Sequence, residues 1–371
     1  MNGAAMLALA VWLYLIALHG RFWQSGPVLP PGRLVWAPPV AIVVPARDEA
    51  AVIETTIRSL LAQDYPGPFR VILTDDGSRD GTGDIARRLD DARLTVIGGT
   101  RRPAGWSGKL WAVSQGIAVS EPAELILLTD ADIVHDPAHL TRLVALLERH
   151  DLDMASEMVT LACDSAAERA FVPAFVYFFQ MLYPFAWVND PLRATAAAAG
   201  GTILIRRRAL ARIGGIEAVR GALIDDVALA RAVKAGGRIW LGHAEMARSI
   251  RPYPAVADIW RMITRTAYVQ LRFSPLLLAA TTAAMAVTWL VPPGMALFAD
   301  GPARWCGIIA WLLLAGSYLP TLTRFRRSPL WAPCLPLVAT FYMAATIGSA
   351  VNHYAGRGVA WKGRAYQGSG A

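Results

Sequence analysis

Three pairs of acidic residues are the feature of this sequence with the most obvious capacity for chemistry. They are Asp75 with Asp76, Asp130 with Asp132, and Asp225 with Asp226. Carboxylate oxygens are the ligands that Mg²⁺ and Mn²⁺ prefer, and a carboxylate can also remove a proton from a hydroxyl group. The question that the sequence raises is whether the chain brings these pairs to one place.

The middle pair directly follows an apolar run, residues 125–129 with the sequence LILLT. Apolar residues without alternation are typical of a strand that is buried on both faces of a parallel sheet. Ligands bind at the carboxyl ends of such strands, where Asp130 and Asp132 can both turn toward a divalent cation that carries a diphosphate. On this motif alone, a solvated turn at the end of a strand is an equally good interpretation.

Strands and helices alternate from Val40 onward. We expect strands at residues 41–44, 70–74, 94–97 and 125–129, and helices at 49–61, 80–89, 109–119 and 137–150, with shorter strands at 202–205 and 238–241. Asp48 is a plausible N-cap of the first helix. This alternation predicts an α/β fold with a mostly parallel sheet that is covered by helices on both faces.

The turns that follow the first two strands carry polar side chains and lack a G-x-G-x-x-G sequence, which disfavours a dinucleotide-binding Rossmann domain and a P-loop. Polar side chains after the first strand would therefore contact the ligand, although Asp48 and Glu49 are also typical of a helix start. After the second strand, a carboxylate at Asp75 or Asp76 can accept the imide N–H of a uracil ring.

Two further positions are candidates near the start of helices. Lys109, near a helix N-terminus, can approach diphosphate oxygens, while a solvated lysine is an equally good interpretation. Asp226 follows Asp225 at the start of the helix expected at 227–234 and is our choice for the base that deprotonates an acceptor hydroxyl. The alternative is that both carboxylates only stabilise the helix N-terminus.

Composition indicates membrane segments, since 55% of the 371 residues are hydrophobic and only 17% are charged. We expect a transmembrane anchor at 1–20, a linker at 21–39, the catalytic domain at 40–254, an interfacial amphipathic helix at 255–274, a transmembrane region at 275–352 and a basic tail at 353–371. The aromatic stretch 171–188 is broken by prolines and favours an interfacial helix pair.

Charge and cysteine content point to the same setting. The net charge of +8 comes from arginines that are dispersed or flank apolar segments, which favours anionic lipid over nucleic acid as a partner. Three widely spaced cysteines imply no disulfide framework, as suits a cytoplasmic catalytic domain. Arg324, Arg326 and Arg327 predict a cytoplasmic loop, but the basic C-terminal tail conflicts with the resulting topology, so we expect three or four spans.

The motifs VPARDEA, DDGSRDGT, GKLWAVSQG and DAD, with the later DD pair, together resemble those of the family 2 glycosyltransferases over roughly Val40 to Arg272. The anchor, the broken aromatic stretch and the closing WKGRAYQ resemble the hopene-associated glycosyltransferase subgroup. Processive family members carry a Gln-x-x-Arg-Trp motif. The stretch at 260–267 reads WRMITRTA, where only Arg265 can match, and this disfavours a polysaccharide synthase.

The resemblance implies a GT-A fold and a role for each matching residue. On the donor side, Pro45, Arg47 and Glu49 would line the nucleoside pocket, and Asp75 or Asp76 would bind the nucleotide base. Lys109 would lie near the diphosphate, Asp130 would contact the ribose or sugar, and Asp132 would bind the metal. Asp226 would be the catalytic base beside Asp225, which replaces the family's glutamate.

We therefore expect a multi-pass enzyme of the cytoplasmic (inner) membrane with its catalytic domain in the cytoplasm. With Mg²⁺ or Mn²⁺ it would transfer a sugar, with inversion, from a nucleotide-sugar donor, UDP-linked, to a lipid acceptor such as a hopanoid. The alternatives are a processive polysaccharide synthase and a non-catalytic membrane partner that retains the nucleotide-binding fold. A transporter is disfavoured because the expected spans lack buried charges.

Overall fold

The computed structural model of the protein describes residues 2–356, 360–361 and 364–365. Most of the predicted basic tail, including Arg357, Lys362 and much of the WKGRAYQ motif, lies outside the described residues. The chain forms two compact units. The helical unit comprises Met1–Gly26, Cys163–Ala186 and Tyr253–Val359, and the sheet unit comprises Pro27–Ala162, Trp187–Pro252 and Ala360–Ala371.

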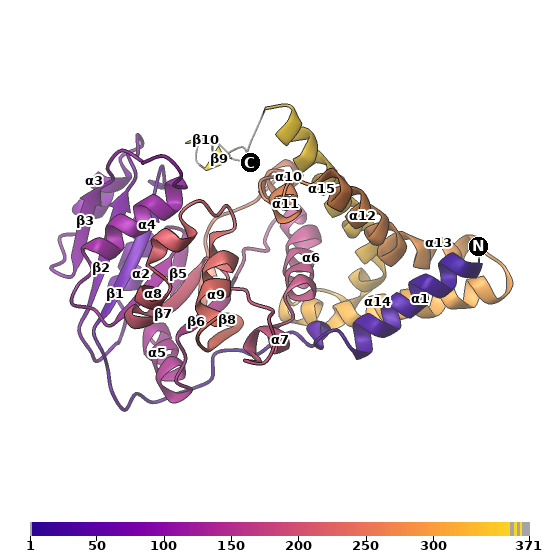
Figure 1. Ribbon diagram of the computed structural model, residues 1–371, viewed down its shortest axis with the longest axis horizontal. Helices are drawn as coiled ribbons and strands as arrows, with labels where there is room; N and C mark the ends of the chain where they lie inside the picture. Colours follow the sequence, from indigo (N-terminus) through magenta and orange to yellow (C-terminus); the bar gives the residue numbers. More distant parts are fainter. Residues whose placement is uncertain (1, 357–359, 362–363, 366–371) are drawn as a thin grey trace. The chain divides into compact units, whose positions relative to one another are not determined.

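The sheet unit is built on one mixed sheet (Figure 1). Its strands are β1 (Val40–Ala46), β2 (Phe69–Asp75), β3 (Leu94–Gly98), β4 (Leu125–Thr129), β5 (Ile133–His135), β6 (Met154–Thr160), β7 (Thr202–Arg206) and β8 (Ile239–Ser249), in the order β3-β2-β1-β4-β7-β6-β8-β5. The β3-β2-β1-β4 half is parallel, as is the β6–β8 pair, whereas β7 is antiparallel to both its neighbours and β5 to β8.

Helices cover both faces of this sheet, as the alternating pattern predicted. They are α2 (Ile53–Leu61), α3 (Thr82–Arg87), α4 (Gly108–Ala118), α5 (His139–Arg149), α8 (Arg207–Arg212) and α9 (Asp225–Lys234), with a 3₁₀ turn at Ile216–Val219. Helices α2 and α5 share a core with β1, whose residues are buried on both faces. Helix α4 packs on the other face, where a Cβ at Gly116 would lie 2.5 Å from Val43.

The structure differs from the predicted elements in several details. Helix α2 begins at Ile53 rather than at Glu49, and Asp48 is not its N-cap. Asp48 has a left-handed backbone (φ 51°), and its carboxylate accepts a hydrogen bond from the Arg79 backbone N–H at 2.8 Å instead. Strand β6 was not predicted, because its buried Ser156 and Glu157 interrupt the apolar pattern.

The helical unit consists of α1 (Asn2–Ala17), α6 (Ala166–Leu182), α10 (Val256–Thr264), α11 (Ala267–Gln270), α12 (Pro275–Met285), α13 (Val291–Phe298), α14 (Gly301–Arg324) and α15 (Leu335–Tyr354), with short 3₁₀ helices at Phe22–Gln24 and Pro329–Cys334. Helix α7 (Phe185–Asn189) lies where the chain passes from one unit to the other. The stretch expected to be one interfacial helix, 255–274, contains the two helices α10 and α11.

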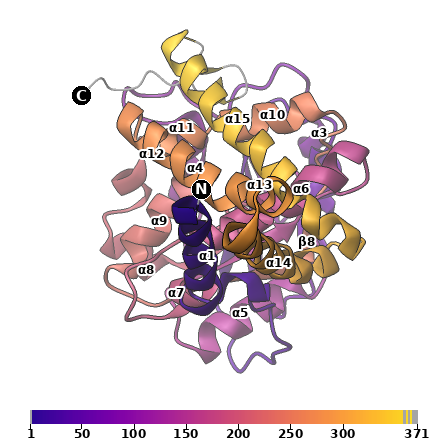
Figure 2. The ribbon, with the colours of Figure 1, turned by 90° about the vertical axis from the view of Figure 1, so that its right-hand side faces the viewer.

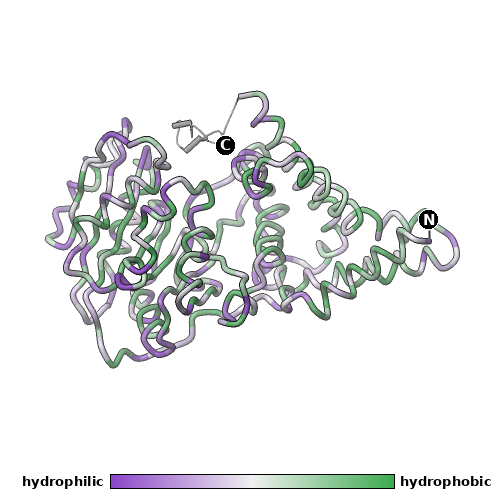
Figure 3. The backbone as a smooth tube through the Cα atoms, viewed as in Figure 1, coloured by the Kyte–Doolittle hydropathy of each residue, from purple (hydrophilic) through white to green (hydrophobic). Residues whose placement is uncertain are grey.

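Three helical segments of the described chain are long and apolar enough to span a membrane: Pro275–Phe298, Gly301–Arg324 and Pro329–Tyr354. Pro292 and Pro293 do not break the first, because a π-helical turn at Ala286–Leu290 precedes them. Figure 3 shows the apolar character of these helices, and many of their large hydrophobic side chains, such as Leu312 and Leu337, are exposed. This exposure is typical of surfaces that face lipid.

The N-terminal helix α1, with 16 residues, is shorter than these segments. It lies beside α14 (Figures 1 and 2), and the Trp12 indole donates a hydrogen bond to the Thr288 carbonyl oxygen at 2.8 Å. Helix α6 runs unbroken through Pro173 and starts with a capping box formed by Ser165 and Glu168. It is anchored by a 2.6 Å hydrogen bond between the Tyr177 and Ser317 hydroxyl groups.

Candidate active site

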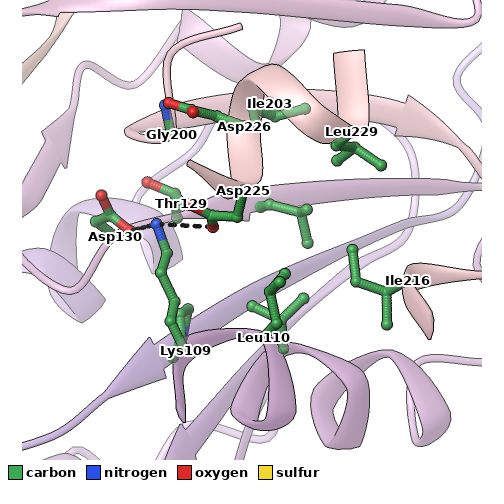
Figure 4. A pocket seen from close by; sticks show the side chains of 13 residues that line it. Lys109, Leu110, Thr129, Asp130, Gly200, Ile203, Ile216, Asp225, Asp226 and Leu229 are labelled. Carbon is green, nitrogen blue, oxygen red and sulfur yellow. Dashed lines mark hydrogen bonds and ion pairs between the residues drawn. The ribbon is translucent and has the colours of Figure 1, made fainter. Parts of the chain in front are cut away.

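A pocket opens in the sheet unit at the carboxyl ends of β1 and β4 (Figure 4). Its polar lining is formed by Lys109, Thr129, Asp130, Gly200, Asp225 and Asp226, and its apolar lining includes Pro45 and Leu229. The antiparallel pairing of β4 with β7 places Thr129 opposite Thr202, so the Gly200-Gly201 turn lies beside Asp130. The residues named here come from five separate stretches of the chain.

Lys109 lies at the centre of this pocket. Helix α4 begins at Gly108, with the Ser107 hydroxyl as its N-cap. The Lys109 Nζ atom lies 2.8 Å from Asp130 Oδ1 and 3.5 Å from Asp225 Oδ2 (Figure 4). Although burial opposes the charged form, these two carboxylates raise the pKa of Lys109 above its ordinary value. Lys109 is therefore a fixed cation between two of the predicted acidic pairs.

Asp226 is held by backbone N–H groups. Its Oδ2 accepts a hydrogen bond from Gly200 N at 2.9 Å, and its Oδ1 accepts one from Val227 N at 2.8 Å. Burial and the neighbouring Asp225 carboxylate raise the pKa of Asp226 to about 7, against the opposing effect of Lys109. A carboxyl group with such a pKa is suited to accept a proton at neutral pH.

A second cluster joins Asp132 to the first strand-helix turn through Arg251. The Arg251 guanidinium donates from Nε to Asp132 Oδ2 at 2.7 Å and from Nη2 to the Glu49 carboxylate at 2.7 and 2.8 Å. Burial opposes the charged form of Arg251, but the two carboxylates raise its pKa. Arg251 was not predicted, because it lies 119 residues from Asp132 and only the antiparallel pairing of β5 with β8 brings it close.

Loss of the Arg251 side chain is expected to destabilise the protein. In Arg251→Ala, the nearly buried Asp132 and Glu49 carboxylates would be left without their shared cation. We expect the free energy of unfolding to fall by about 2 kcal/mol, less than for a fully buried pair because Arg251 is one-third exposed, with a lower Tm in thermal unfolding. Arg58→Ala, which breaks an exposed ion pair with Glu54, is the control. Equal Tm values for the two variants would contradict this role.

The remaining predicted residues lie in the turns after β1 and β2. Arg47 donates from Nη1 to the Asp76 carbonyl oxygen, and the Asp76 side chain is buried. Asp75 has a turn-forming contact, since its Oδ1 accepts from Ser78 N at 3.0 Å. The two turns are joined by hydrogen bonds from Asp48 N to Ser78 Oγ and from Glu49 N to Thr82 Oγ1. The buried Asp76 carboxylate also pairs with the Arg47 guanidinium, since Arg47 Nη1 lies 3.9 Å from Asp76 Oδ2.

The carboxylates of the site fit a divalent cation that arrives with a phosphate ligand. Within residues 2–356, 360–361 and 364–365 no three His, Cys, Asp or Glu side chains form a closed metal site. Mg²⁺ commonly binds one or two carboxylates together with substrate phosphates, so such a cluster is not required. Asp130 and Asp132 supply two carboxylates at one strand end, and because Arg251 and Ser249 contact Oδ2 of Asp132, its Oδ1 is the oxygen available to a metal.

Comparison with known proteins agrees with this geometry. Residues 41–214 match the profile of glycosyl transferase family 2. The chain is 26% identical over 260 residues to the probable glycosyltransferase YdaM of Bacillus subtilis, covering 64% of this chain and 57% of YdaM. It is 31% identical over 159 residues to a beta-monoglucosyldiacylglycerol synthase of Synechocystis, covering 35% of this chain and 32% of the synthase. The chain thus spans between a third and somewhat over half of these relatives.

The fold also has a solved counterpart. A mannosyltransferase from Pyrobaculum calidifontis, in complex with GDP-Man and Mn²⁺, matches with a TM-score of 0.60 and 20% identity, covering 94% of this chain and 98% of that one. The fold is that of the GT-A glycosyltransferases. Residues 41–214 therefore form a glycosyl transferase family 2 domain, as the motifs predicted. The resemblance to the hopene-associated subgroup stays a prediction.

Proposed function

We propose that this protein is a membrane-bound, inverting glycosyltransferase that moves a sugar from a UDP-linked donor to the hydroxyl group of a lipid. The observation that carries the proposal is the Asp226 carboxyl group. It lies in a family 2 domain, has a pKa of about 7, and shares a pocket with the Lys109–Asp130 ion pair. In this pocket Asp226 can accept a proton while Lys109 attracts a negatively charged donor.

In this scheme Asp226 removes the proton from the acceptor hydroxyl as its oxygen attacks the anomeric carbon, and the bond to the donor diphosphate breaks on the opposite side. Lys109 holds Asp130 in place and offers positive charge toward the leaving diphosphate. A divalent cation, held by Asp132, would stabilise the same negative charge when it is bound, while Asp130 would contact the ribose or sugar of the donor. The Gly200 N–H keeps the Asp226 carboxylate oriented.

Donor recognition would involve the turns after β1 and β2. Asp76 would accept the imide N–H of uracil, while Pro45, Arg47 and Glu49 would border the nucleoside. Support comes from the buried Asp76 side chain and from Arg47, which contacts the Asp76 backbone. Asp75 would keep the shape of the turn through its hydrogen bond with Ser78.

A lipid acceptor is supported by the three apolar segments and by the names of relatives, which include beta-monoglucosyldiacylglycerol synthases. A hopanoid alcohol is the acceptor that the subgroup resemblance favours, and diacylglycerol is the one that these relatives favour. Arg324, the last residue of the second segment, and Arg326 and Arg327, which follow it, support a cytoplasmic loop in the inner membrane.

The test uses the purified full-length protein in phospholipid nanodiscs with Mn²⁺, a panel of radiolabelled UDP-sugars, and either diacylglycerol or a hopanoid alcohol. The expected result is radiolabel in the organic phase, with one sugar on each lipid. A ladder of products would favour a polysaccharide synthase instead. UDP binding without transfer from any donor would favour a non-catalytic partner subunit.

The pH dependence of transfer should report on Asp226. Below a pH of about 7 the carboxyl group is protonated and cannot accept a proton, so kcat/KM should fall as the pH is lowered. Asp225→Asn removes a negative charge that raises the pKa of Asp226. The acid limb of the profile, which is the fall of kcat/KM toward low pH, should therefore move to lower pH. The matched control is Asp84→Asn in the first turn of α3, which should leave the limb in place. A limb that moves to higher pH in Asp225→Asn would contradict the assignment.

A further inference from the structure

Four buried polar side chains lead from the lining of the acidic pocket into the core of the sheet unit. They are Thr129 at the end of β4, His135 in β5, His139 in α5 and Glu157 in β6, and none is more than 3% exposed. Burying such groups is costly unless each finds a hydrogen-bond partner. Thr129 also lines the pocket, but the scheme above gives none of the four side chains a role.

These side chains form a continuous chain of hydrogen bonds. Glu157 Oε2 lies 2.6 Å from His139 Nε2, and His139 Nδ1 lies 2.9 Å from His135 Nδ1. His135 Nε2 lies 3.0 Å from Thr129 Oγ1, and that hydroxyl donates to the Gly201 carbonyl oxygen at 2.8 Å. The chain thus runs from β6 through α5 and β5 to the turn that precedes β7.

The direction of each hydrogen bond follows from the Gly201 carbonyl, which can only accept. The Thr129 hydroxyl must therefore donate to Gly201 and accept from His135 Nε2–H. Burial and the adjacent His139 hold the pKa of His135 well below its ordinary value, so His135 is neutral and its Nδ1 accepts from His139 Nδ1–H. One further proton lies between His139 Nε2 and Glu157 Oε2.

The turn at which this chain ends is the one that contacts Asp226. Gly200, next to Gly201, donates its backbone N–H to Asp226 Oδ2 at 2.9 Å. Ser156 fixes the same turn from β6, because its hydroxyl donates to the Thr202 carbonyl oxygen and accepts from Ala199 N, both at 2.9 Å. A Cβ at Gly201 would lie 2.9 Å from Val159, so the turn is also closely packed.

We propose that Glu157, His139, His135 and Thr129 form a buried positioning relay that fixes the 199–202 turn and so directs the Gly200 N–H at Asp226. The relay residues are positioning residues, since they act through this turn. The inference rests on the proposed role of Asp226 as the base. This role would explain why His135, His139 and Glu157 are buried together, although burial of polar groups is energetically unfavourable.

Thr129→Val tests the relay with almost no change in volume. The variant removes the donor to Gly201 and the acceptor of His135 Nε2–H. We expect kcat to fall about 10- to 100-fold while the KM for the UDP-sugar is unchanged. Because the Gly200 hydrogen bond lowers the pKa of Asp226, the acid limb should move to higher pH; the charged neighbours Asp225 and Lys109 remain in place. Thr129→Ser, which restores the hydroxyl, should restore both kcat and the limb.

The matched control is Thr74→Val. Thr74 is fully buried one residue before Asp75 in β2, and its hydroxyl has no hydrogen-bond partner within the part of the chain that the structure describes. Thr74→Val should therefore keep the wild-type kcat and acid limb. A second comparison probes the far end of the relay. Glu157→Gln can still donate to His139 Nε2 and should retain most of the turnover, whereas Glu157→Leu should lose it.

A readout that needs no turnover completes the experiment. In the full-length protein labelled with ¹³C at the aspartate side chains, the carboxyl signal that disappears in Asp226→Asn is followed through a pH titration. The midpoint should be higher in Thr129→Val than in Thr74→Val, and equal midpoints would overturn the relay. If the midpoint shifts but the wild-type protein transfers sugar from no UDP-sugar, the relay stands and the proposed function fails.

Discussion

Replacing Asp226 with asparagine is expected to lower kcat by about 10²- to 10⁴-fold while UDP binding is retained. Asparagine has nearly the same shape, and its one amide oxygen can accept either the Gly200 or the Val227 backbone N–H, but it cannot take a proton from the acceptor hydroxyl. Initial rates of lipid glycosylation and calorimetric titration with UDP, measured at the same pH, separate the two quantities.

Asp84→Asn is the matched control for this experiment. Asp84 also lies in the first turn of a helix, but it is exposed and pairs with Arg87 at 2.8 Å. This variant should behave like the wild-type protein in both measurements. If Asp226→Asn kept more than about a tenth of the wild-type kcat, another group would have to be the base.

Replacing Lys109 with methionine is expected to lower kcat/KM by about 10²- to 10³-fold, the magnitude found when a group that stabilises developing negative charge is removed. The variant would leave Asp130, Asp225 and Asp226 in one pocket without their cation. Because Lys109 lowers the pKa of Asp226, its loss should raise that pKa, and the acid limb of kcat/KM should move to higher pH. A pH–rate profile measures both effects.

The control for Lys109→Met is Lys234→Met. Lys234, the last residue of α9, donates from Nζ to the carbonyl oxygens of Trp187, Val188 and Thr195 at 2.7 to 2.9 Å. Its loss should lower Tm and leave the acid limb at its wild-type pH, because Lys234 does not lie in the pocket. An acid limb that is equally unmoved in Lys109→Met would show that Lys109 does not affect Asp226.

The sequence alone was sufficient to predict the parallel half of the sheet. Strand β1 is apolar throughout, β4 is apolar up to Thr129, and both are buried on both faces, so their pattern is unambiguous. Strand β6 could not be predicted in the same way, because Ser156 and Glu157 are buried through hydrogen bonds rather than through apolar contacts. The antiparallel placement of β7 between β4 and β6 depends on pairing between distant segments, which no local pattern records.

The candidate site was likewise predictable only in part from the sequence. Carboxylates at strand ends were predictable, because the carboxyl ends of parallel strands meet at one edge of a sheet. The structure does bring Lys109, Asp130, Asp225 and Asp226 into one pocket. The contacts of Arg251 and of the relay through His135 were not predictable, because they depend on which residues of distant strands lie opposite each other. The pairing of Ile133 with Ser249, for example, brings the residues near both strand ends together. Asp48 was misread because its left-handed backbone turns its carboxylate toward Arg79.

The sheet unit is not continuous in sequence, because a segment of the helical unit interrupts it, and this affects folding during synthesis. Strands β1 to β6 precede the Cys163–Ala186 segment of the helical unit, whereas β7 and β8 follow it. Because β7 pairs with both β4 and β6, the ribosome completes the α6 segment while those two strands still lack their shared neighbour. The nascent chain therefore carries unpaired strand edges during this interval, a state prone to aggregation that a chaperone can shield. Gly200, Asp226 and Arg251 are all translated afterwards, so a chain truncated within α6 would contain the turns after β1 and β2 but would lack the proposed base.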